Sequence, residues 1–111
     1  MKLLIDDLNE FYSENVRLVK TLMKRESVDE YPELLKWKLQ MLYFDGNDWM
    51  EICRIDNYPH EGEVGVHIHA YKKEKVERIE LTFEEADRAI KEISGKILKE
   101  RFKENIEFGD D

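Results

Sequence analysis

All three histidines of the chain lie within ten residues of one another, shortly after an arginine and an aspartate. They are His60, His67 and His69, and the preceding pair is Arg54 and Asp56. Imidazoles exchange protons near neutral pH, and a guanidinium stabilises the charge of a phosphate, so these residue types suit metal-free phosphodiester chemistry. The five residues are therefore our candidate catalytic residues.

The same group also permits metal binding. His67 and His69 stand two apart in a predicted strand, so they project from one face, roughly 6–7 Å apart, and can share a metal ion. Asp56 or His60 would supply a third ligand, which predicts a site for a divalent transition metal. A third interpretation is that the histidines are polar residues on an exposed strand, with Arg54 and Asp56 forming a weak surface pair.

Four segments around these residues predict strands, namely residues 34–44, 49–56, 64–71 and 76–81. Alternation of apolar and polar residues, with many branched and aromatic side chains, is typical of strands. The segment "WMEICRID" is apolar on both faces, which favours a central position. If it neighbours "VGVHIHAY", the arginine and aspartate share the open face of the sheet with two histidines. The last strand is expected to bury Ile79 and Leu81.

Two helices are expected to bracket these strands. In the first 25 residues apolar side chains recur at spacings of three and four, as at Leu4, Leu8 and Phe11. Near the other end, "TFEE" forms a capping box in which Thr82 and Glu85 begin a helix. The predicted fold class is α+β, in the order α-β-β-β-β-α: an N-terminal helix, a four-stranded antiparallel sheet and a C-terminal helix. Both helices would pack on one face of a single domain, residues 1–111.

Composition limits the environment and the partners. The net charge is −8, so the surface as a whole repels phosphate backbones, and contact with nucleic acid requires a local basic patch. Cys53 is the sole cysteine, which excludes an internal disulfide and multi-cysteine zinc and indicates a reducing cytoplasm. Alternation turns Cys53 away from Arg54, so we assign it to the core. No apolar run has the length of a membrane span.

Two broader expectations follow from the same composition and element order. Many Glu and Lys residues with a single Gln are typical of thermophile proteins. A four-stranded sheet with two helices leaves apolar surface to cover, which predicts a homodimer or another docking partner.

The run "HIHAYKKE" has the pattern H-x-H-x4-E, with Glu74 as the acid, and resembles the metal motif of the cupins. The pattern differs at both ends: Gly62 lies one residue too close, and Leu81 stands where the closing glycine belongs. The chain also has too few predicted strands for a jelly roll.

The run "RIDNYPHEGEVGVHIH" resembles the core motif of the TumE family of small archaeal and bacterial proteins. That motif has an R-x-D-N segment, a Pro-His soon after, a histidine cluster on the next strand and then a helix, and the resemblance spans about residues 49–98. The matching polar positions are Arg54, Asp56, Asn57, His60, His67 and His69. This chain has Glu61 where family members often have another histidine, and the family usually begins with strands.

The resemblance implies a cytoplasmic toxin of a toxin–antitoxin pair. Its partner would be a small helix-turn-helix antitoxin, and its target RNA or a nucleotide. The alternatives that the residues leave open are a non-enzymatic protein-binding module and a small metal-binding protein.

Overall fold

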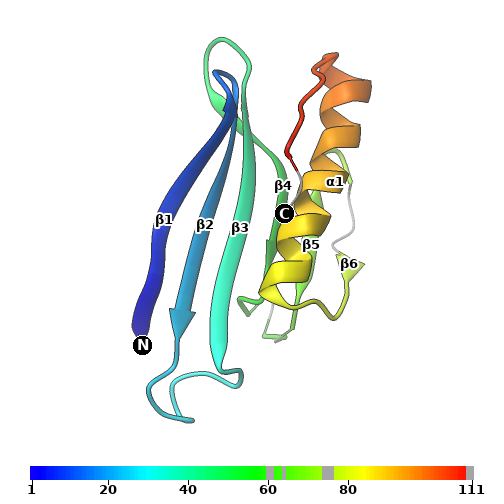
Figure 1. The fold of residues 1–111 in the computed structure, drawn as a ribbon. Coiled ribbons are helices and arrows are strands. Elements are labelled where there is room, and N and C mark those ends of the chain that lie inside the picture. The colour runs from blue at the N-terminus through cyan, green and yellow to red at the C-terminus, as the bar shows by residue number, and fades with distance from the viewer. Residues whose placement is uncertain (60–61, 64, 74–76, 110–111) are drawn as a thin grey trace.

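The computed structural model describes residues 1–59, 62–63, 65–73 and 77–109, and in these the chain forms six strands and one helix (Figure 1). The elements are β1 (Lys2–Ser13), β2 (Val16–Lys24), β3 (Leu35–Phe44), β4 (Trp49–Asp56), β5 (His67–Ala70), β6 (Glu77–Arg78) and α1 (Phe83–Phe102). The strands pair antiparallel in sequence order, and α1 packs on one face of the sheet, against β3 and β4. The expected four-stranded sheet between two helices is therefore wrong.

The N-terminal segment forms the hairpin β1–β2 instead of the predicted helix. Register shifts between Leu3 and Ile5, between Ile5 and Leu8, and between Phe11 and Ser13 place extra residues in β1. Each extra residue lengthens the spacing of side chains that share a face, so spacings of two become mixed with spacings of three. That mixture imitates the period of a helix, which explains why the sequence pattern was misleading.

The predicted central strands are confirmed, whereas the predicted last strand is mostly absent. β3 and β4 have the expected positions, and β4 lies between β3 and β5. β6 contains only two residues, and Ile79 beyond it is 45% exposed, so its predicted burial is wrong. Leu81 packs at the margin of the core. The chain leaves the sheet early because α1 must begin directly after Thr82.

The hydrophobic core lies between α1 and the sheet. Its fully buried members include Leu18, Leu39, Met41, Cys53, Ile55, Ile90 and Leu98. Burial raises the pKa of the Cys53 thiol to about 12, so the thiol stays neutral and the assignment of Cys53 to the core is confirmed.

The predicted capping box begins α1. The amide of Glu85 donates to Thr82 Oγ1 over 3.1 Å, and the amide of Thr82 donates to Glu85 Oε1 over 2.9 Å. Lys20 of β2 then fixes the helix to the sheet, because its ammonium lies 2.9 Å from Asp87 of α1 and 3.0 Å from Glu10 of β1. None of the helices in the described ranges is long and apolar enough to cross a membrane.

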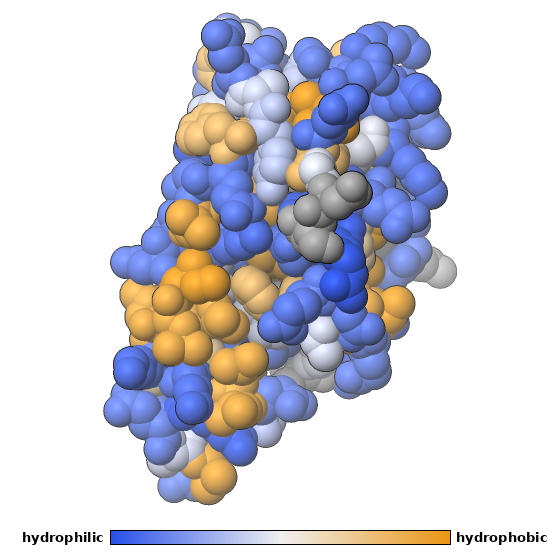
Figure 2. All heavy atoms as spheres, in the orientation of Figure 1, coloured by the Kyte–Doolittle hydropathy of each residue, from blue (hydrophilic) through white to orange (hydrophobic). Residues whose placement is uncertain are grey.

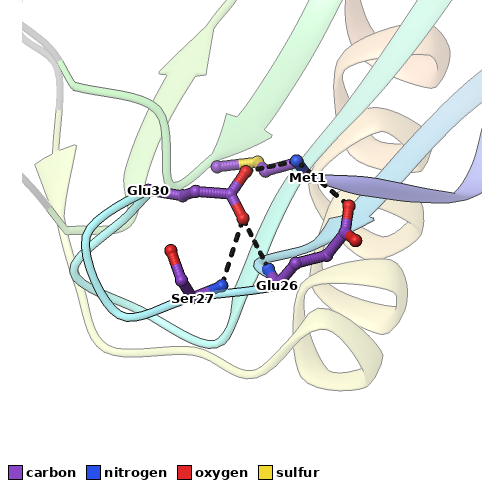
Figure 3. Close-up of polar contacts among 4 residues, drawn as sticks. All are labelled: Met1, Glu26, Ser27 and Glu30. Carbon is purple, nitrogen blue, oxygen red and sulfur yellow. Dashed lines mark hydrogen bonds and ion pairs between the residues drawn. The ribbon is translucent and has the colours of Figure 1, made fainter.

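The amino terminus is tied to the loop between β2 and β3 (Figure 3). The Glu30 carboxylate accepts hydrogen bonds from the amides of Glu26 and Ser27, over 2.7 and 3.1 Å, and from the ammonium of Met1. The contact with Glu30 raises the pKa of the Met1 ammonium, and the same contact lowers the pKa of Glu30. This carboxylate therefore connects the start of β1 to the β2–β3 loop.

Candidate functional site

The sheet has a second face, turned away from α1, which we call the open face. In β3 the buried residues Trp37 and Leu39 face the helix, so Lys36, Lys38 and Gln40 lie on the open face. In the register of β3 and β4, Gln40 is the partner of Arg54. Because residues opposite each other in an antiparallel pair share a face, the open face also carries the candidate residues of β4.

Four of the five candidate residues are brought together there. Arg54 pairs with His69, and Asp56 pairs with His67, in adjacent positions of the β4–β5 ladder. Side chains directly opposite each other have Cβ atoms about 4.5–5.5 Å apart. The expected juxtaposition of the two strand pairs is therefore confirmed, while His60 lies outside the described residues.

The register extends this group into two rows across the sheet. The first row contains Lys38, Asp56, His67 and Arg78, and the second contains Gln40, Arg54 and His69. Arg78 is also paired with Glu63, 3.2 Å away. Sequence reasoning missed Lys38, Gln40 and Arg78 as neighbours of the site. The alternation of β3 had already indicated the polar face of Lys38 and Gln40, but Arg78 depended on the register of β6.

The carboxylate of Asp56 is buried and holds the arginine of the second row. Asp56 Oδ2 lies 3.1 Å from Arg54 Nε, and the Asp56 side chain is 7% exposed against 32% for Arg54. Asp56 Oδ1 accepts a hydrogen bond from the amide of Tyr58 over 2.9 Å. With one oxygen fixed by the backbone and the other beside the guanidinium, Asp56 orients Arg54 while leaving part of it in solvent.

The two strand histidines differ in access. His67 is 4% exposed, whereas His69 is half-buried. His69 borders a pocket of about 220 Å³, which is also lined by Glu51, Ile52, Ala70, Tyr71 and Lys72. A ligand can therefore reach His69 and Arg54, while His67 and Asp56 support them from below.

Asn57, which matches the last position of the R-x-D-N segment, serves the sheet. Its Oδ1 accepts from the amide of Trp37 over 2.8 Å, and its Nδ2 donates to the carbonyl of Leu35 over 2.8 Å. Its own amide donates to the carbonyl of Trp37. The side chain thus continues the β3–β4 ladder beyond the end of β4.

The metal hypothesis finds limited support in this geometry. Among the residues that the structure describes, no group of three or more His, Cys, Asp or Glu side chains could hold a metal ion. Asp56 is engaged by Arg54, and the guanidinium opposite His69 would repel a cation. A metal on His67 and His69 would need a donor from elsewhere, such as His60; Glu74 of the cupin-like pattern is likewise outside the described residues.

Comparisons with protein-family models, with curated proteins and with solved structures found no match. The fold and the site alone therefore define the class of protein: an antiparallel sheet with a helix on one face and rows of Arg, His and Asp on the other.

Proposed function

We propose that this protein is a toxin-like enzyme that acts on RNA or nucleotides, with Arg54 and His69 as its reactive pair. The observation that carries the proposal is their direct opposition on the open face, beside a pocket, with a buried carboxylate orienting the arginine. The motif resemblance to TumE adds support. The strands at the N-terminus also remove one of the two differences from that family's pattern.

The chemistry follows from what each group can do. Arg54 binds the phosphate oxygens and stabilises the charge that grows on them during attack. His69, as the neutral imidazole, accepts the proton of the attacking hydroxyl while the new oxygen–phosphorus bond forms. As the bond from phosphorus to the leaving oxygen breaks, the imidazolium returns this proton to that oxygen. Asp56 positions Arg54 and does not touch the substrate.

The test is cleavage of RNA by the parent and two variants. His69→Ala and Arg54→Ala should each lower the cleavage rate by about 10²–10⁴-fold, because each removes a group that acts in the transition state. Arg88→Ala is the matched control, since Arg88 is an exposed arginine of α1, and it should cleave at the parent rate. The same variants, induced in a bacterial host, should lose growth arrest while keeping their soluble yield. Folded variants with unchanged cleavage would refute the proposal.

A different observation favours the alternative of a non-enzymatic docking module. Leu3, Leu4 and Leu8 of the edge strand β1 are each nearly half exposed, and Figure 2 shows apolar side chains gathered over β1 and β2. The predicted dimer would then form through β1 rather than through two helices. An antitoxin partner, a second copy and a cytoplasmic location stay predictions. Under this alternative, Leu4→Lys with Leu8→Lys would abolish toxicity, and His69→Ala would not.

A further inference from the structure

Cations stacked on aromatic rings lie near both ends of the open face. Near one end, the guanidinium carbon of Arg17 is 4.3 Å from the centroid of the Trp49 ring, and Phe11 stands edge-on to that ring. Near the other end, Lys36 Nζ is 4.5 Å from the centroid of the Tyr58 ring. Arginine planes and aromatic rings are the surfaces on which proteins stack unpaired bases.

The register places both groups on the same face as the candidate site. Arg17 is two residues from Val19, which pairs with Gln40, the partner of Arg54. Trp49 is two residues from Glu51, whose carboxylate accepts a hydrogen bond from Gln40. Because alternate residues of a strand share a face, the two aromatic groups flank Arg54 along the strands.

The charge of this face is opposite to that of the whole chain. On β2 to β6 its cations are Arg17, Lys36, Lys38, Arg54 and Arg78, against the carboxylates of Glu51 and Asp56. Within the described part of the chain, the ion pairs do not include Arg17, Lys36 or Lys38. In a chain of net charge −8, such cations form a local patch suited to a polyanion.

We infer that the open face binds single-stranded RNA along the strand direction, with Trp49 and Tyr58 marking the two ends of the binding surface. The choice of RNA rests on the proposed function. A single strand fits because its bases are free to stack, whereas the bases of a duplex are stacked on one another. The seven residue steps from Trp49 to Asp56 span roughly 23 Å, enough for about four nucleotides. Arg54 and His69 then meet the phosphates in the middle of the bound strand.

The experiment measures binding of a fluorescent RNA octamer by anisotropy, using the His69→Ala variant so that the probe stays intact. Trp49→Ala should weaken binding roughly tenfold, and Trp49→Phe, which keeps an aromatic face, should restore most of it. Lys36→Ala with Lys38→Ala should weaken binding and make the log–log dependence on salt shallower by about one. Lys96→Ala with Lys99→Ala, two exposed lysines of α1, is the matched control and should bind as the parent does.

Three further probes complete the test. A two-nucleotide RNA should bind much more weakly than the octamer, the RNA duplex should bind weakly, and single-stranded DNA of the same sequence reports how far the 2′-hydroxyl contributes. Octamer binding unaffected by both Trp49→Ala and the Lys36/Lys38 double variant would overturn the inference. RNA cleavage with such unaffected binding would sink the inference and leave the proposed function standing. Trp49-dependent binding without cleavage by the parent would do the reverse.

Discussion

Arg54, Asp56 and Asn57 stand at the end of β4, and their side chains serve different purposes. Arg54 and Asp56 form the ion pair of the open face, whereas Asn57 bonds to the backbone of β3 at Leu35 and Trp37. A motif that reads as one polar run thus divides into a reactive part and a structural part.

Replacing Asn57 should therefore affect stability. Asn57→Ala leaves a buried amide and a buried carbonyl of β3 without partners, at about 1–3 kcal/mol each. We expect the free energy of unfolding, measured with urea, to fall by about 2–4 kcal/mol. Gln40→Ala, on the exposed part of the same sheet, should change it by much less. An unchanged urea midpoint for Asn57→Ala would show that water or another group replaces these bonds.

Among the elements, α1 depends on its N-terminal cap and β1 on its partner strand. The two hydrogen bonds between Thr82 and Glu85 satisfy amides that the first helical turn leaves open. β1, by contrast, has no cap or regular period of its own, since its bulges break the alternation.

The cap gives a prediction at this scale. Thr82→Ala removes the hydroxyl that accepts from Glu85, so the free energy of unfolding should drop by about 1 kcal/mol. Thr82→Ser keeps the acceptor and should remain close to the parent. Thermal unfolding followed by circular dichroism compares the three proteins; equal midpoints would mean that the first turn is held by packing alone.

For the molecule as a whole, Lys20 connects the helix to both strands of the N-terminal hairpin. Burial by itself would lower the pKa of Lys20, but hydrogen bonds to Asp87 and Glu10 outweigh it and raise the pKa above its ordinary value of 10.5. A pKa raised on folding means that the ion pairs contribute their full stability below the unfolded value and lose it as pH rises through the folded value.

Changing Lys20 should test this connection. Lys20→Ala leaves two partly buried carboxylates without their cation, so the free energy of unfolding should fall by about 2–3 kcal/mol at pH 7. Lys20→Met, which keeps the chain length, should recover the packing part of that loss. The difference between the parent and Lys20→Met should shrink above about pH 10.5 in urea titrations. A difference that stays constant from pH 7 to 11 would contradict the assigned pairing.

The sequence by itself determined the features that short-range patterns encode. Alternation identified β3 and β4, the two apolar faces of "WMEICRID" indicated its central position, and the capping box indicated where α1 begins. The same alternation placed Arg54 and Asp56 together and His67 and His69 together. Each of these depends on residues only a few positions apart, where backbone geometry leaves few choices.

Only the tertiary structure decided the rest. β1 became a strand because pairing with β2 rewards bulges that a local pattern mistakes for a helical period. Lys38 and Arg78 joined the site because the register of distant strands set them beside Asp56 and His67. The burial of His67 and the accessibility of His69 were also undetermined by the sequence, because exposure depends on which neighbouring chain segments cover each side chain once the sheet has formed.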